Sequence, residues 1–228
     1  MPDRPVQPVT IRIDDARSVS GLLMRPEAAR ACFVFAHGAG AGMAHKFMTV
    51  VADSLAARDI ASLRFQFPYL ERGSRRPDPP PLCHATVRAA VAAATELCHG
   101  LPLVAGGRSF GGRMSSQAQA REPLPGVRGL AFLGFPLHPA GRPSDERAQH
   151  LFQVHVPLLF IQGSRDELAE LDRLEALVER LGAIATLEVL RDADHAFHVP
   201  ARSGRDDRTV LAGAVATLAG WILATLRT

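Results

Sequence analysis

The sequence has little lysine, little cysteine and few aromatic residues other than phenylalanine. Lys46 is the only lysine among 26 basic residues, so arginine supplies nearly all of the positive charge behind the net charge of +3. The arginines are scattered and often stand beside acidic residues, which argues against the basic stripe of a nucleic-acid-binding surface. The cysteines, Cys32, Cys83 and Cys98, form no CxxC pair, so we expect neither a disulfide framework nor a zinc site.

Long apolar runs are scarce as well. The N-terminal MPDRPVQPVT is charged and proline-rich, and it lacks the apolar centre of a signal peptide. The run TVLAGAVATLAGWILATL, residues 209–226, comes nearest to a membrane span. Its two glycines and three threonines favour a buried C-terminal helix instead. These features predict a cytoplasmic protein without a membrane or a nucleic-acid partner.

Short apolar runs alternate with stretches of helical character over residues 1–228, which are 47% hydrophobic and 21% charged. The runs ACFVFAHG, IASLRFQFP, LPLVAGG, VRGLAFLGFP, VPLLFIQG and ATLEVL each stop at glycine, proline or a charged residue, and VTIRI with VSGLLMR reads as an opening hairpin. Helices are expected over 44–58, 83–99, 110–121, 167–182 and 206–227. This alternation predicts a single α/β domain with a mostly parallel sheet and helices on both faces.

The motif G-x-S-x-G occurs at Gly107-Arg108-Ser109-Phe110-Gly111, between a predicted strand and a predicted helix. A serine at such a position occupies a sharp, strained turn, and the flanking glycines avoid collisions with neighbouring backbone. The helix N-terminus then directs free N–H groups toward the hydroxyl. We therefore predict that Ser109 is a nucleophile. The alternative is a glycine-rich helix entry in which Ser109 is only an N-cap.

A serine nucleophile needs a base, and the base needs an acid that orients it. Asp166 follows the strand-like LLFIQG, and His195 follows the last predicted strand, so the order Ser, Asp, His expected for this architecture holds. Glu167 is the rival acid, although we expect it to start the next helix. His198 is the rival base, but it lies three residues farther from the strand.

The loop HGAGAGM, which follows CFVFA, is the expected source of an oxyanion donor. We assign one donor to the backbone N–H of Phe110 and the second to that of Ala39, with Gly40 as the alternative. His37 is expected to hold this loop in shape. A phosphate-binding turn does not fit here, because no G-x-G-x-x-G can be aligned with the loop.

Two long loops, 68–82 and 136–147, follow strands and are expected to lie over the carboxyl edge of the sheet, where open α/β sheets bind ligands. Arginines gather around this edge: Arg72, Arg75, Arg76, Arg108 and Arg142. They either bind an anionic group of the substrate or are solvated loop residues of an arginine-rich chain. Arg108 could also turn back and tie down loop 68–82 through Glu71 or Asp78. The residues predicted to bind substrate are His37, Gly38, Gly40, Arg76, Arg108 and His138.

Over nearly its whole length the chain resembles the α/β-hydrolase superfamily. The motifs HGAGAGM, LRFQFPYLERGSRRPD, GGRSFGGRMSS, FPLHPAGRP, IQGSRD and DADHAF resemble a subgroup of the small, dienelactone-hydrolase-like branch. Its animal relatives include a hydrolase-fold subunit of a histone acetyltransferase complex. The resemblance implies Ser109 as nucleophile, Asp166 as acid and His195 as base. True dienelactone hydrolases use a cysteine as nucleophile, so the serine here argues against dienelactone itself as the substrate.

These observations predict a serine esterase that acts on a small soluble substrate, with no metal and no organic cofactor, as a monomer or homodimer. The interval 137–155 leaves room for one short helix, SDERAQHLF, and predicts an open site with a minimal cap. Two alternatives remain: a binding or scaffold protein of the same fold, and a peptidase of the prolyl-oligopeptidase type. The second would need a large gating domain, for which 228 residues leave no room.

Overall fold

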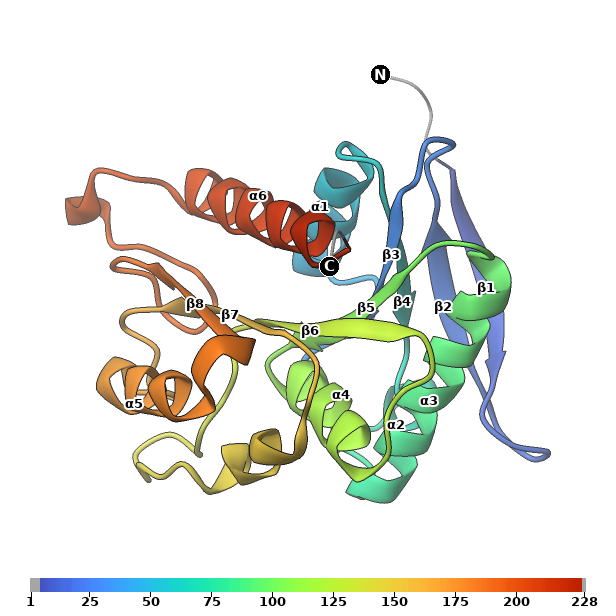
Figure 1. The fold of residues 1–228 in the computed structure, drawn as a ribbon, viewed down its shortest axis with the longest axis horizontal. Helices are drawn as coiled ribbons and strands as arrows, with labels where there is room; N and C mark the ends of the chain where they lie inside the picture. The colour runs from blue at the N-terminus through green and yellow to red at the C-terminus, as the bar shows by residue number, and fades with distance from the viewer. Residues whose placement is uncertain (1–4, 227–228) are drawn as a thin grey trace.

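Eight strands form one twisted sheet in the computed structural model, which describes residues 5–226 (Figure 1). The strands are β1 (Val6–Arg12), β2 (Ser18–Met24), β3 (Ala31–Ala36), β4 (Ile60–Phe65), β5 (Leu103–Arg108), β6 (Val127–Leu133), β7 (Leu158–Gly163) and β8 (Ala185–Leu190). Their order in the sheet is β1-β2-β4-β3-β5-β6-β7-β8. The β1–β2 and β2–β4 pairs are antiparallel and the remaining pairs are parallel, which confirms the predicted hairpin and parallel sheet.

Helices cover both faces of this sheet, as predicted for an α/β fold. The helices are α1 (Lys46–Ala56), α2 (Pro68–Glu71), α3 (Pro80–Leu97), α4 (Phe110–Arg121), α5 (Leu171–Leu181) and α6 (Asp207–Thr225), with the 3-10 helices η1 (Glu146–Gln153), η2 (Gly182–Ile184) and η3 (Ala201–Ser203). Figure 1 shows α1 and α6 on one side of the sheet and α3, α4 and α5 on the other. The central strands β3, β4 and β7 are buried at every position, because both of their faces are covered.

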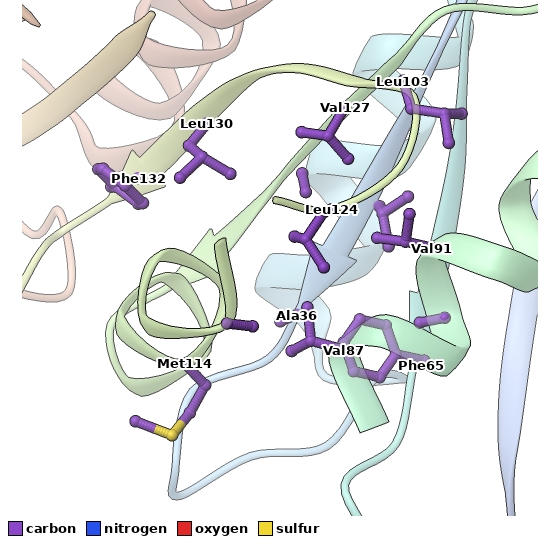
Figure 2. Close-up of a cluster of buried hydrophobic side chains, with 14 of the residues drawn as sticks. Ala36, Phe65, Val87, Val91, Leu103, Met114, Leu124, Val127, Leu130 and Phe132 are labelled. Carbon is purple, nitrogen blue, oxygen red and sulfur yellow. The ribbon is translucent and has the colours of Figure 1, made fainter. Parts of the chain in front are cut away.

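Two layers of apolar side chains fill the space between the sheet and the helices. Figure 2 shows part of the α3–α4 side, where Val87 and Val91 of α3 and Met114 of α4 belong to one buried cluster with Phe65 and Phe132 of the sheet. The other layer joins the sheet to α1 and α6. Each large side chain buried in this way contributes about 1.5–3 kcal/mol, so the two layers fix the positions of the strand ends.

Two predicted helix boundaries are wrong by a few residues. α3 begins at Pro80 rather than residue 83, because proline is well suited to the first turn of a helix. α5 begins at Leu171 rather than residue 167. The Asp166 carboxylate accepts the N–H of Leu168, so Glu167 lies in a turn before the helix. The ends of the predicted domain and C-terminal helix, residues 1–4 and 227–228, lie outside the described residues.

α6 is the one described helix that is long and apolar enough to cross a membrane. Its inner face carries Val210, Val215, Leu218 and Ile222, which are buried in the layer that joins α1 and the sheet. The predicted packing of this helix against the core is therefore confirmed for that face.

Candidate active site

Ser109 follows β5 directly and precedes α4, in the sharp turn that the sequence predicts. Its backbone has φ 49° and ψ −116°, in a region that L-residues rarely adopt. The Ser109 N–H donates to the carbonyl of Leu133 in the neighbouring strand β6, which holds the turn in place. The side chain makes no capping hydrogen bond to α4. The alternative of a simple N-cap serine therefore does not fit the structure.

The glycines around Ser109 are required by close backbone approach. A Cβ at Gly107 would lie 2.4 Å from the carbonyl oxygen of Ala36. A Cβ at Gly111 would lie 2.5 Å from the carbonyl oxygen of His37. Real Cβ atoms do not approach backbone so closely, so only glycine lets α4 pack against the end of β3. The G-x-S-x-G spacing thus places Ser109 beside the HGAGAGM loop.

Ser109, His195 and Asp166 form a continuous chain of hydrogen bonds. His195 Nε2 lies 2.8 Å from Ser109 Oγ, and His195 Nδ1 lies 2.6 Å from Asp166 Oδ2. A carboxylate accepts only, so Nδ1 carries the proton and Nε2 is left to accept from the serine hydroxyl. The three residues follow β5, β7 and β8, whose carboxyl ends meet at one edge of the sheet. This geometry allows His195 to take a proton from Ser109.

The Asp166 carboxylate is fixed by donors besides His195. Gln162, the buried polar residue of β7, donates its side-chain N–H to Asp166 Oδ2 at 2.5 Å, and the Leu168 N–H donates to Oδ1 at 2.8 Å. Gln162 also accepts the N–H of Phe135. Gln162 was missed in the sequence analysis, although a lone polar residue in the apolar run LLFIQG is a usable signal.

The rival residues lie elsewhere. His198 is exposed and its Nδ1 lies 2.6 Å from Asp207, at the start of α6. Glu167 is exposed in the turn after Asp166. Asp194 accepts the N–H groups of Ala196 and His198 and so closes the tight turn that presents His195.

His37 is buried at the start of the HGAGAGM loop and holds it through hydrogen bonds. Its Nε2 accepts the N–H of Phe67 at 3.1 Å, so its proton resides on Nδ1, which donates to the carbonyl of Gly38 at 2.7 Å. Burial lowers the pKa of His37 to about 4, so the ring is neutral at neutral pH. The hydroxyl of Tyr69 donates to the carbonyl of Ala39. Tyr69 was not singled out from the sequence, although it is the only tyrosine.

The backbone N–H groups of Phe110, the first residue of α4, and of Ala39 make no hydrogen bond to a protein group within residues 5–226. In a trans peptide the N–H points away from the carbonyl, so the bond from His37 to the Gly38 carbonyl turns the Ala39 N–H away from His37. A Cβ at Gly38 would lie 3.8 Å from Ser109 Cβ, so this peptide borders Ser109. The N–H of Gly40 also has no partner within the same range, so it stays an alternative.

Aromatic rings form a packed cluster next to Ser109. The Phe110 ring lies 5.4 Å from that of Phe67 and 6.4 Å from that of Tyr69, both edge to face. His37 packs edge-on against Phe67 at 5.0 Å. Phe67, Tyr69 and His37 are fully buried and Phe110 is partly exposed, so this cluster supports the turn at Ser109 from inside the protein.

The structure places His37 and His138, both predicted to bind substrate, inside the protein. Both side chains are fully buried, and both ring nitrogens of each bind protein groups. His138 Nδ1 lies 2.9 Å from the Pro139 carbonyl, and Nε2 lies 2.9 Å from Glu170 Oε2. His138 therefore ties the loop after β6 to the residues before α5. Gly38 borders Ser109, whereas Gly40 is exposed, and a Cβ at Gly40 would meet no atom within 4 Å.

Arg108 packs against α1 and not against loop 68–82. The Arg108 guanidinium lies 4.2 Å from the centre of the Phe47 ring of α1, and burial lowers the pKa of Arg108. It does not tie down loop 68–82, where Arg72 pairs with Asp78 and Glu71 accepts the N–H of Ser20.

Arg76 lies apart from the triad. It is exposed and lines a hollow of about 530 Å³ together with Arg72 and Asp78. None of Ser109, Asp166 and His195 lines this hollow.

No group of three or more His, Cys, Asp or Glu side chains able to hold a metal ion occurs within residues 5–226. The cysteines Cys32, Cys83 and Cys98 are all buried free thiols. Burial raises the pKa of Cys83 to about 12.

Comparisons with known proteins agree with this arrangement. Residues 29–223 match the family model described as alpha/beta hydrolase domain. Dienelactone hydrolase from Anabaena variabilis has a TM-score of 0.80 at 21% identity, covering 97% of this chain and 98% of that one. An alpha-beta serine hydrolase homologue from Coxiella burnetii has a TM-score of 0.71 at 18% identity, covering 96% and 97%. A Xanthomonas campestris protein, described as a serine hydrolase without a lid, has a TM-score of 0.69 at 20% identity, covering 97% and 94%.

Proposed function

Because the chain belongs to the alpha/beta hydrolase domain family and has the α/β-hydrolase fold, we propose that it is a serine esterase. Its substrate is a small soluble ester, which it cleaves through an acyl-enzyme on Ser109. The observation that carries the proposal is the hydrogen-bonded chain Ser109–His195–Asp166, with distances of 2.8 and 2.6 Å. Solved structures of similar fold include an esterase domain from Rhodothermus marinus.

The reaction begins when Ser109 Oγ attacks the ester carbonyl and His195 Nε2 takes the hydroxyl proton. Asp166 holds the ring with Nδ1 protonated and stabilises the imidazolium that forms. The N–H groups of Phe110 and Ala39 donate to the developing oxyanion. His195 then protonates the leaving alcohol, and water releases the acyl group by the same steps in reverse.

The test compares variants on a panel of p-nitrophenyl esters of increasing chain length, with thioesters and lactones beside it. We expect Ser109→Ala and His195→Ala to lower kcat by at least about a thousandfold, because each removes a participant in proton transfer. Asp166→Asn should lower kcat less, because the base loses only its orienting partner.

His198→Gln is the matched control, since His198 is an exposed histidine in the same loop. It should retain wild-type kcat. Folding of each variant is checked by circular dichroism. An inactive His198→Gln variant together with an active His195→Ala variant would contradict the proposal and identify His198 as the base.

A further inference from the structure

A hollow of about 380 Å³ lies beside α4, on the flank away from the sheet, and none of the triad residues lines it. Its walls include His84 of α3 and His150 of η1, and its floor includes Gln117 and Arg121 of α4. Gln117 is eight residues after Ser109, which places the hollow about 12 Å from the nucleophile along the helix axis. We refer to these four residues as the α4 groove.

Polar atoms at the α4 groove are left without partners. His84 is only 6% exposed, its Nε2 lies 3.1 Å from Gln117 Oε1, and its buried Nδ1 has no hydrogen-bond partner. Beside the groove, Arg113, one turn before Gln117 on α4, has a buried Nε that is also unpartnered. A buried polar atom without a partner costs about 1–3 kcal/mol, so a ligand that supplies a partner is favoured. His84 Nε2 donates to the Gln117 amide oxygen, so Nδ1 accepts in the neutral ring and donates only when the ring is protonated.

Unpaired arginines outnumber unpaired carboxylates around the groove. Arg113, Arg121 and Arg147 make no ion pair with a carboxylate in the part of the chain described, and burial together with the nearby Arg147 lowers the pKa of Arg113. Glu122 pairs with Arg88 at 3.3 Å and Asp145 pairs with Arg180 at 3.1 Å, which leaves Glu146 at the start of η1 as the nearby carboxylate without an ion pair among the described residues.

Burial and the nearby arginines lower the pKa of both histidines of the groove. Burial and the nearby Arg113 lower the pKa of His150 to about 4. Burial, with Arg121, Arg88 and Arg113, also lowers the pKa of His84.

We propose that the α4 groove binds an oxyanion, a phosphate or a carboxylate, at a place distinct from the bond cleaved at Ser109. Arg121, which lines the groove, supplies guanidinium donors that match the geometry of these groups, and Arg113 adds positive charge near both histidines. A bound anion also reverses the local field, so His84 can take a proton on Nδ1 and donate to it. The shared chemistry fits either an acid group of the substrate or a separate small anion.

The test titrates the full-length protein with inorganic phosphate, with acetate in a second arm and chloride as the ionic-strength control. Binding is followed by NMR of the histidine ring signals. We expect saturable shifts of the His84 and His150 signals, and a rise in the pKa of both rings when phosphate or acetate is bound.

Arg121→Gln should weaken binding about tenfold, because one charge-assisted contact is lost. Arg58→Gln is the matched control: it makes the same charge change at an exposed arginine after α1, on the opposite face of the sheet. Shifts that do not saturate, or equal weakening in both variants, would overturn the proposal and indicate diffuse attraction.

Phosphate binding needs no turnover, so this result is separate from the fate of the esterase proposal. A second measurement distinguishes the two sources of the anion. Esters with and without a terminal carboxylate, of equal length, are compared in wild type and Arg121→Gln. If Arg121→Gln lowers kcat/KM selectively for the acidic ester, the groove binds an acid group of the substrate. If kcat/KM changes equally for both esters while wild type still binds phosphate, the groove binds a separate anion.

Discussion

At the scale of single residues, His37 illustrates how a buried side chain shapes the site without entering the reaction. Its Nε2 accepts the N–H of Phe67, and its Nδ1–H donates to the Gly38 carbonyl. Protonation of Nε2 would set two donors against each other in a buried place. The neutral ring therefore supports the loop that carries Ala39.

A pH dependence of stability follows from His37. Burial lowers its pKa from 6.5 to about 4, so the unfolded chain binds a proton more readily than the folded one between these values. Neutral His37 makes its full contribution to the free energy of unfolding above pH 6.5. This contribution is lost as the pH falls, so the free energy of unfolding is about 2 kcal/mol lower at pH 5. Urea unfolding at pH 7.5 and 5.0 measures the change.

Two variants isolate the effect of His37. His37→Gln should have a lower free energy of unfolding than wild type at pH 7.5. Its free energy of unfolding should fall less than that of wild type between pH 7.5 and pH 5.0. His99→Gln removes an exposed histidine and should leave the loss unchanged. An identical loss in wild type and His37→Gln would show that other groups control the acid sensitivity.

At the scale of elements, the close approach of β5, α4 and the end of β3 fixes the position of Ser109. Gly107→Ala should destabilise the protein by about 2–3 kcal/mol or more, because its Cβ would lie 2.4 Å from the Ala36 carbonyl oxygen. Gly213→Ala is the control, since no atom lies within 4 Å of a Cβ there, in the exposed part of α6.

Gly213→Ala should raise stability by up to about 1 kcal/mol, which is an increase of about 2–4 °C in Tm for a chain of this size. Thermal unfolding of both variants measures the contrast. A Gly107→Ala variant as stable as wild type would mean that the backbone around Ser109 has more room than the structure indicates.

Much of this arrangement could be predicted from the sequence, because strand ends and chain order place Ser109, Asp166 and His195 at one edge of the sheet. Side-chain directions could not be predicted in the same way. Arg108 adjoins Ser109 in the chain but packs on Phe47 of α1, and His138 turns inward to Glu170. Gln162 and Tyr69 hold groups that are distant in sequence, so local patterns do not reveal their partners.

At the scale of the whole molecule, the interval between β6 and β7 holds only the 3-10 helix η1 as regular structure. This agrees with the predicted short cap. We expect short-chain soluble esters to be hydrolysed faster than emulsified triglycerides, because η1 offers little surface that could open at a lipid interface. Rates on p-nitrophenyl butyrate and on emulsified tributyrin measure the preference. A jump in rate when the emulsion forms would contradict it.

The central claim is that Ser109 is a nucleophile activated by His195. Labelling of the folded protein with a fluorophosphonate, followed by peptide mass spectrometry, tests it most directly, because this probe reacts with activated serines and requires no knowledge of the substrate. We predict one adduct, on Ser109, which is absent in Ser109→Ala and forms at least about a hundredfold more slowly in His195→Ala. A folded wild-type protein that takes no label, or takes it at another residue, would contradict the claim.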